Sequence, residues 1–346
     1  MDKPKVCMVS AHFPPGLSGV GDYTKLMGEA LSDKLEVYYA VPNGDFDLSE
    51  LTSTTAAELV NWLCCTGIEN ICMQYTPNLY GWKNLWPLYF VKMARMQGRK
   101  VIVVFHEVFM PHYDSIIRGF FQRIWNNHKD REMIGRCDAC IVTTPDRVKI
   151  CKRYAKGKVD MIPVGSNIPV AHIPDAEKQS LKIKLKGENS LIFGCFGLYH
   201  KDKNYEAVVD CAAEIKDAAF VFIGGFENKY SKEIQNRVQT AGAGERVRFL
   251  FNQPAQRVSF ILQALDCFIF SDIKGPSGRK GSWMAALSHN LPVLRAQTKK
   301  QIFQCVERIL QNPSILDNMR EESRVLFERE YNWRVLASKL EGFFIP

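Results

Sequence analysis

The chain has 346 residues, of which 46% are hydrophobic and 24% charged, a balance that is typical of globular proteins and excludes a disordered or fibrous chain. Its length exceeds what one hydrophobic core usually serves, so we expect two domains. The formal net charge of +8 favours anionic partners such as sugar nucleotides, phosphorylated lipids or acidic membranes. Nucleic acid is disfavoured, because the basic residues are scattered and form no stripe with exposed aromatics.

The first half of the chain alternates short apolar strands with helices. We expect strands over residues 5–11, 35–41, 69–74, 100–106, 138–144 and 159–163, with helices over 23–31, 56–66 and 84–97. This alternation predicts a parallel, doubly wound sheet. Residues 168–186 are charged, contain proline and are weakly periodic, so we interpret them as a linker with a short helix.

A second alternating set follows the linker. We expect strands over residues 191–196, 219–223, 247–250, 267–271 and 291–294, with helices over 205–215, 229–241, 256–265, 283–287 and 302–311. The sequence thus predicts an α/β protein with two Rossmann-like domains, 1–167 and 168–330, that face each other across a cleft. After Leu294 a further strand would be normal, so either a unit has been lost or residues are missing from this sequence.

The eleven cysteines do not have the spacing of a disulfide framework. Many lie inside apolar runs, where a free thiol behaves as a small hydrophobe. Cys137 and Cys140 form a C-x-x-C pair, but no second pair follows at zinc spacing. The start of the chain has too short an apolar run for a signal peptide, and no segment has the length to span a bilayer. We therefore expect a cytoplasmic protein without a metal site.

Residues 275–293 run from a polar, glycine-punctuated loop into an apolar helix. Ser282 is the expected N-cap of that helix, and Asn290 tolerates the left-handed conformation at its end. Backbone N–H groups and the positive helix end would converge beside basic side chains, which predicts a phosphate site. Its candidate residues are Ser277, Gly278, Arg279, Lys280, Gly281 and Ser282. The alternative is a solvated basic turn before an ordinary core helix.

The loop after the first strand is a second candidate phosphate site. Ser18, Gly19, Val20 and Gly21 precede the first helix, where glycines let the backbone approach a ligand. The loop is not G-x-G-x-x-G, and no acidic residue ends the second strand. Nicotinamide and flavin dinucleotides therefore fit poorly.

Two more candidates follow central strands. His106 lies at the carboxyl edge of the first sheet, where it could bind a polar ligand, unless neighbouring backbone groups already satisfy it. Lys201 and Lys203 lie in the loop 196–204, and both can point into the cleft. A lysine ammonium is a good point charge for phosphate, and the alternative is two solvated lysines.

Together these segments resemble glycosyltransferase family 4, the retaining GT-B enzymes that use nucleotide sugars. The resemblance covers nearly the whole chain and rests on FPPGLSGVGDYT near the start, HE after a central strand, IPVGSNIP at the domain junction, FGLYHKDKN opening the second domain, and NLPVL. The terminal YNW also resembles the start of the family's closing helix. By that resemblance, residues 331–346 return to the first domain.

The chain departs from the family pattern at three positions. Leu198 stands where the family has an arginine that holds the diphosphate together with Lys203, and Ser277 and Ala285 stand where it has paired glutamates. The segment S-x-R-K-G-S resembles a bacterial polysaccharide subgroup in which a basic pair replaces the glutamates. Arg279 would then supply the missing guanidinium. Alternatively, the site is degenerate and inactive.

The resemblance implies transfer of a hexose from a UDP-sugar to a glycan or lipid-linked acceptor in surface polysaccharide synthesis, with UDP-glucose as the first donor to expect. Lys203 and Arg279 would stabilise the leaving diphosphate, and His106 would bind the donor sugar. The chain has no Asp-x-Asp, so we expect neither a metal nor another cofactor. The alternatives are a UDP-sugar 2-epimerase of the same fold and an inactive nucleotide-binding subunit.

Residues 115–136 combine Phe120, Phe121 and Trp125 with several arginines. Such a helix could rest on an anionic membrane that carries a lipid-linked acceptor, at its inner face. The alternative is an aromatic stripe that faces the core, with a solvated basic face opposite.

Overall fold

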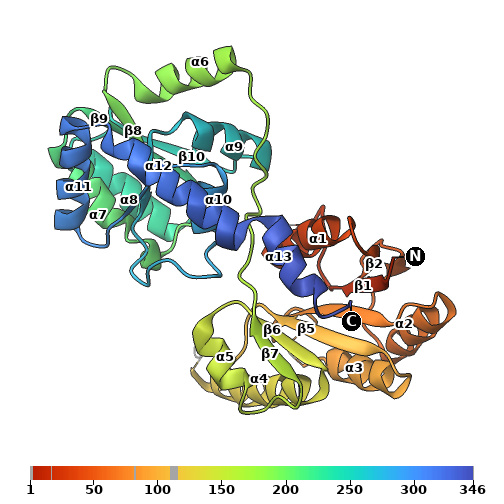
Figure 1. The fold of residues 1–346 in the computed structure, drawn as a ribbon. Coiled ribbons are helices and arrows are strands. Elements are labelled where there is room, and N and C mark those ends of the chain that lie inside the picture. Colours follow the sequence, from red (N-terminus) through yellow and green to blue (C-terminus); the bar gives the residue numbers. More distant parts are fainter. Residues whose placement is uncertain (1–2, 17, 82, 110–115, 346) are drawn as a thin grey trace. The chain divides into compact units, whose positions relative to one another are not determined.

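The computed structural model describes residues 3–16, 18–81, 83–109 and 116–345. The chain divides into two compact units, which are Met1–Gly165 with Trp333–Pro346, and Ser166–Asn332. We call them the first unit and the second unit (Figure 1). The boundaries expected from the sequence, 167/168 and 330/331, lie close to these.

The first unit is built on a seven-stranded parallel sheet, in which the strand order is β3-β2-β1-β4-β5-β6-β7. The strands are β1 (Lys5–Val9), β2 (Glu36–Val41), β3 (Phe46–Asp47), β4 (Asn70–Tyr75), β5 (Lys100–Phe105), β6 (Ala139–Val142) and β7 (Lys158–Met161). All six strands expected from the sequence occur. The added β3 is a two-residue pairing with β2, too short to leave a pattern in the sequence.

Helices cover the sheet of the first unit on both faces. They are α1 (Gly19–Leu31), α2 (Ser53–Cys65), α3 (Trp86–Met96), α4 (Ile116–Arg136), α5 (Pro145–Cys151) and the C-terminal α13 (Trp333–Glu341). Helix α13 packs beside α1, where Leu336 and Leu340 share a core with Met27 and Leu31. The C-terminal segment therefore belongs to the first unit because its apolar stripe completes that core.

The second unit has a five-stranded parallel sheet of order β10-β9-β8-β11-β12. Its strands are β8 (Leu191–Phe196), β9 (Ala218–Gly224), β10 (Val247–Phe251), β11 (Cys267–Phe270) and β12 (Val293–Arg295). Its helices are α6 (Asp175–Lys186), the single 3₁₀ turn η1 (Lys201–Lys203), α7 (Tyr205–Glu214), α8 (Lys229–Thr240), α9 (Ala255–Ala264), α10 (Gly281–Ser288), α11 (Lys299–Gln311), α12 (Ile315–Leu326) and the π-helical η2 (Phe327–Tyr331). After β12 the chain enters α11 directly, with Thr298 as its N-cap.

The cysteines contribute to the two cores. Eight of the eleven are buried, and all are free thiols. The Sγ atoms of Cys137 and Cys140 lie 3.2 Å apart without a bond between them. In the described part of the chain, no helix combines the length and the apolar character needed to cross a bilayer.

Candidate active site

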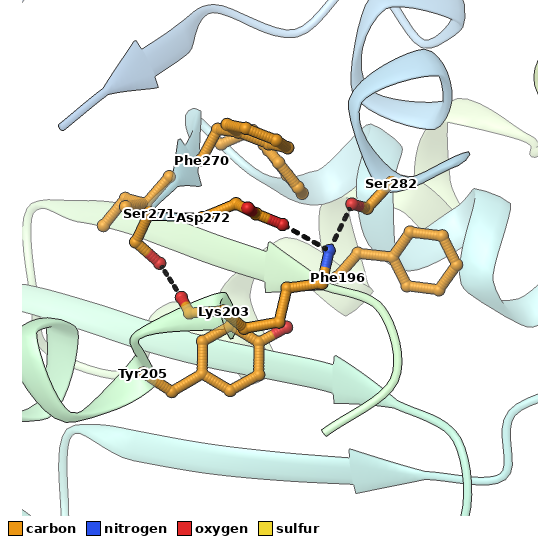
Figure 2. Close-up of a pocket in the computed structure, with 9 residues that line it drawn as sticks. Phe196, Lys203, Tyr205, Phe270, Ser271, Asp272 and Ser282 are labelled. Carbon is orange, nitrogen blue, oxygen red and sulfur yellow. Dashed lines mark hydrogen bonds and ion pairs between the residues drawn. The ribbon is translucent and has the colours of Figure 1, made fainter. Parts of the chain in front are cut away.

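A small cavity in the second unit opens where β8 and β11 end. These strands are neighbours in a parallel sheet, so the segments that follow them meet at one edge. Tyr205 contributes a buried hydroxyl that has no hydrogen-bond partner among the described atoms. The cavity is lined by Phe196, Lys203, Tyr205, Phe268, Ile269, Phe270, Ser271, Asp272 and Ser282 (Figure 2).

The turn after β8 brings Lys203 to this cavity. The His200 side chain accepts a hydrogen bond from the Asp202 amide and starts η1, and Asn204 adopts a left-handed conformation (φ 51°) that leads into α7. Gly197 has to be glycine because of its backbone conformation and its closeness to Lys203. Its φ is 138°, and a Cβ there would lie 3.2 Å from Nζ of Lys203, so a side chain would obstruct the ammonium group.

The Lys203 ammonium is held by side chains from β11 and α10. Its Nζ donates a 2.8 Å hydrogen bond to Ser282 Oγ and lies 3.9 Å from Asp272 Oδ2. The Ser271 hydroxyl donates to the Lys203 carbonyl at 2.6 Å and fixes the turn (Figure 2). Burial lowers the pKa of Lys203, and the Asp272 carboxylate opposes part of that effect. The result is a positioned ammonium with only 16% of its side chain exposed.

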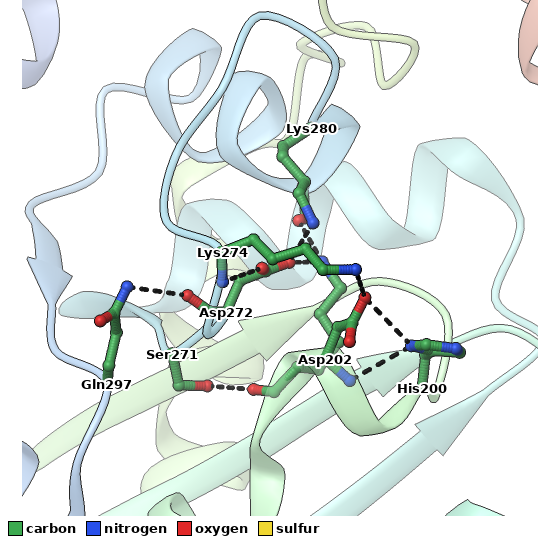
Figure 3. Close-up of polar contacts among 9 residues, drawn as sticks. His200, Asp202, Ser271, Asp272, Lys274, Lys280 and Gln297 are labelled. Atoms are coloured by element: carbon green, nitrogen blue, oxygen red, sulfur yellow. Dashed lines mark hydrogen bonds and ion pairs between the residues drawn. The ribbon is translucent and has the colours of Figure 1, made fainter. Parts of the chain in front are cut away.

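Asp272 organises the charges of the site. Its carboxylate is 1% exposed, accepts a 2.5 Å hydrogen bond from Lys280 Nζ and a 3.0 Å bond from the Lys274 amide, and lies beside Lys203 (Figure 3). The Lys274 ammonium pairs with Asp202 at 2.5 Å, which lowers the pKa of that carboxyl. The charged groups of the site sum to one net positive charge, next to the N-terminus of α10: three lysines (Lys203, Lys274 and Lys280) face two aspartates (Asp202 and Asp272). This arrangement attracts an anion while it keeps the lysines in fixed positions.

The start of α10 differs from the sequence prediction. The helix begins at Gly281 with Lys280 as N-cap and without a side-chain cap, so the prediction of Ser282 as N-cap is wrong. Ser282 lies inside the first turn, where its hydroxyl accepts from Lys203 instead. The helix end follows the prediction, since Asn290 is left-handed with φ 54°.

The remaining candidates of this segment lie away from the cavity lining. Ser277, Gly278 and Arg279 belong to the loop between β11 and α10, and Arg279 is exposed. Ala285, at the family's second glutamate position, is fully buried in α10. The structure therefore brings together Lys203, Lys280 and Ser282, while the guanidinium role of Arg279 remains a prediction.

In the first unit, the predicted glycine loop is the first turn of a helix. Helix α1 begins at Gly19 rather than at residue 23, and the N-cap Ser18 accepts a 3.3 Å bond from the Gly21 amide. A Cβ on Gly21 would lie 3.1 Å from the His12 carbonyl oxygen, so a side chain here would crowd the backbone of the preceding loop. The prediction of a loop here is wrong, because the cap at Ser18 starts the helix earlier than the apolar pattern does.

His106 lies at the same carboxyl edge of the first sheet, directly after β5. Its Nε2 is 2.9 Å from Gln74 Oε1, its ring packs edge-on against Tyr23, and Arg147 donates to its carbonyl oxygen. Burial, with the Arg147 charge, lowers the pKa of His106 to about 3. Because the Gln74 oxygen can only accept, the neutral ring carries its proton on Nε2. Nδ1 is then the acceptor that a ligand hydroxyl could use.

The sequence did not reveal the residues that hold Lys203 and His106 in position. Asp272 follows directly on the buried strand 267–271, so the carboxyl-edge argument could have found it. Gly197 was hidden because its role depends on where Lys203 lies. Gln74 and Arg147, which hold His106, come from β4 and α5, and no local signal links them to it.

Residues 176–294 match the family described as Glycosyl transferases group 1, and this range contains every residue of the cavity. This part of the second unit is a glycosyltransferase domain. No curated protein sequence matches the chain significantly.

Solved structures of low sequence identity share the fold over the full chain. Sucrose-phosphate synthase from Thermosynechococcus elongatus is 16% identical, with a TM-score of 0.69 over 99% of this chain and 98% of that one. Anabaena HepE, solved with UDP-glucose, is 12% identical, with a TM-score of 0.70 over 98% of each chain. UDP-GlcNAc 2-epimerase from Neisseria meningitidis is 12% identical, with a TM-score of 0.62 over 98% of this chain and 99% of that one. The two parallel-sheet units therefore have the GT-B fold.

Proposed function

We propose that the protein is a retaining glycosyltransferase that moves a hexose, glucose in the first instance, from a UDP-sugar to a glycan or lipid-linked acceptor. The observation that carries this proposal is the Lys203 ammonium, held between Ser282 and Asp272 inside the glycosyltransferase domain. HepE, a neighbour solved with UDP-glucose, supports the choice of donor. We place the activity in the cytoplasm, at the inner face of the membrane, in surface polysaccharide synthesis.

The chemistry required of the site is stabilisation of a leaving diphosphate. As the bond between the sugar C1 and the β-phosphate oxygen breaks, negative charge grows on that phosphate. Lys203 and the N-terminus of α10 offer fixed positive potential for it, and Lys280 lies beside them on the same carboxylate. The new bond joins the acceptor oxygen to C1, and the acceptor proton goes to the leaving phosphate. In the first unit, Nδ1 of His106 is proposed to accept from a donor-sugar hydroxyl.

A second candidate is 2-epimerisation of a UDP-sugar, because the Neisseria meningitidis epimerase has the same fold. A third is an inactive nucleotide-binding subunit, which the absence of both family glutamates favours. The reaction separates the three. An epimerase converts the sugar without an added acceptor, a transferase releases UDP and extends an acceptor, and a binding subunit does neither.

The first experiment identifies which nucleotide the protein binds. We expect UDP and UDP-glucose to raise the thermal unfolding midpoint more than GDP, ADP or their sugars do, because ligands that bind the native state stabilise it. The chain is then incubated with UDP-glucose and extracts of glycan and lipid-linked acceptors, and UDP release is followed. A larger shift with GDP or ADP would contradict the choice of nucleotide. Binding of UDP-glucose without turnover under any acceptor condition would favour the inactive subunit.

We also expect transfer to continue after exhaustive EDTA treatment. Asp272, the buried carboxylate of the site, is already paired with Lys280 and the Lys274 amide. Among the residues that the structure describes, no group of three or more His, Cys, Asp or Glu side chains could hold a metal ion. Fixed cations would take the role of an ion, so high salt should weaken donor binding by screening. Activity that EDTA abolishes and magnesium or manganese restores would contradict this expectation.

A further inference from the structure

Helix α4 in the first unit exposes a row of large apolar side chains. Phe120, Phe121, Ile124 and Trp125 are 52%, 64%, 53% and 36% exposed. Among the alternatives weighed from the sequence, an aromatic stripe that faces the core is wrong. Exposed apolar side chains gathered on one helix face mark an interaction surface more often than isolated ones do.

The opposite face of α4 explains why these aromatics point outward. Lys129 is buried and donates to the carbonyls of Pro77 and Gly81, at 3.0 and 3.4 Å. Asp130 is also buried and accepts from the Tyr75 hydroxyl at 3.0 Å and from the Phe109 amide at 2.7 Å. Rotation of the helix to bury its aromatics would break these four hydrogen bonds and leave charged groups without partners. The exposed face is therefore fixed by the fold.

Basic side chains outnumber acidic ones along this face. Arg123 is exposed between the aromatics, and the segment 120–129 contains no Asp or Glu. Further along the helix, Arg131 is exposed and Asp130 is buried, while the partly exposed Glu132 is paired with Arg136 at 2.6 Å. Over residues 120–129 the face thus combines aromatic side chains with cations and carries no acidic residue.

The neighbouring helix α3 extends the same character. It packs beside α4 and exposes Tyr89, Lys92 and Met96, which are spaced so that they share one side of the helix. Tyr89 and Met96 are 54% and 74% exposed. Two adjacent helices of the first unit therefore present apolar and basic side chains to solvent.

We propose that the aromatic face of α4, defined by Phe120, Phe121, Arg123, Ile124 and Trp125, binds the surface of an anionic membrane. Aromatic side chains settle at the boundary between headgroups and acyl chains, and arginine complements anionic headgroups. A helix of this composition lies on a membrane rather than across it. An acidic protein surface would complement the charge of Arg123 but would offer no apolar environment to the four large apolar side chains. This goes beyond the proposed reaction, and it would place the protein where lipid-linked acceptors lie.

Flotation of the full-length protein with vesicles tests the proposal. We expect the protein to float with phosphatidylcholine vesicles that contain phosphatidylglycerol, to float less with phosphatidylcholine alone, and to lose binding at high salt. The double variant Phe121→Ser with Trp125→Ser should lower the partition coefficient by about tenfold, and Arg123→Glu should lower it on anionic vesicles only. Ile183→Ser on α6 is the matched control, because Ile183 is 60% exposed in the other unit. Phe121, Arg123 and Ile183 are largely exposed, so their replacement should leave the thermal unfolding midpoint nearly unchanged. Trp125 is 36% exposed, so its replacement should lower the midpoint modestly, and vesicle binding is measured well below the midpoint of every variant.

The result that overturns the proposal is an absence of flotation with anionic vesicles at low salt, or equal losses in the α4 variants and the Ile183 control. A second copy of the chain is the other possible occupant of the face. Sedimentation would then show a dimer that the Phe121/Trp125 variant abolishes, in place of vesicle binding. No nucleotide or sugar is added, so a failure here is distinguishable from a failure of the proposed reaction.

Discussion

Replacement of Lys203 by alanine is expected to lower kcat for sugar transfer by about a hundredfold to a thousandfold, the range for losing one preorganised group that stabilises transition-state charge. The ammonium is positioned by Ser282 and by Asp272, so its removal takes away charge at the place where the leaving phosphate gains it. The folded state should lose little, because Asp272 keeps its hydrogen bonds with Lys280 and the Lys274 amide. Initial rates at saturating UDP-glucose measure the loss of kcat, and thermal unfolding midpoints measure the change in stability.

Lys201→Ala is the matched control for this variant. Lys201 belongs to the same turn η1 and is exposed, and it does not line the cavity. We expect it to keep a rate within about twofold of the unchanged protein, as for a surface charge. Equal losses in the two variants would show that the loss reflects net charge rather than position. The same assay on Arg279→Ala decides whether that exposed guanidinium also acts on the diphosphate.

Replacement of Asp272 by asparagine is expected to lower the free energy of unfolding by roughly 3 kcal/mol, the scale for breaking a buried ion pair by removing one partner. Asp272 is 1% exposed and lies between the ammonium groups of Lys203 and Lys280. Without its charge the two lysines repel each other in a partly buried site. Chemical denaturation without ligand measures this loss.

An anion in the site should restore part of that stability. Inorganic pyrophosphate would supply negative charge between the same two lysines, so it should raise the unfolding midpoint of Asp272→Asn more than that of the unchanged protein. Asp202→Asn is the control, because its partner Lys274 is largely exposed and such surface pairs contribute little. Equal midpoint shifts in all three proteins would mean that pyrophosphate does not bind at Asp272, and an unchanged stability of Asp272→Asn would contradict its structural role.

Much of the fold could be predicted because buried strands leave a strong local pattern. The strand 191–196 was predicted to the residue, since β8 is an uninterrupted apolar run at the centre of its sheet. Helix starts were less predictable. Helix α1 begins at Gly19 because Ser18 caps it, four residues before the apolar pattern starts. The short β3 depends on a partner strand and has no pattern of its own.

What the sequence determined by itself is which segments reach the carboxyl edges of the two sheets, because all strands of a parallel sheet run in one direction and every loop that follows a strand emerges at the same edge. It could not distinguish Lys203 from Lys201. The contact that selects Lys203 joins it to Ser282, 79 residues later, and only the pairing of β8 with β11 brings the two segments together.

The orientation of α4 was likewise decided by tertiary structure alone. A stripe of aromatics and an opposite polar face look the same in sequence whichever side is buried. Lys129 and Asp130 turn inward because Pro77, Gly81, Tyr75 and Phe109 supply their hydrogen-bond partners, and the aromatics are exposed as a consequence. Burial of a charged group is tolerable only where such partners are already in place, and no local pattern reports on partners about fifty residues away.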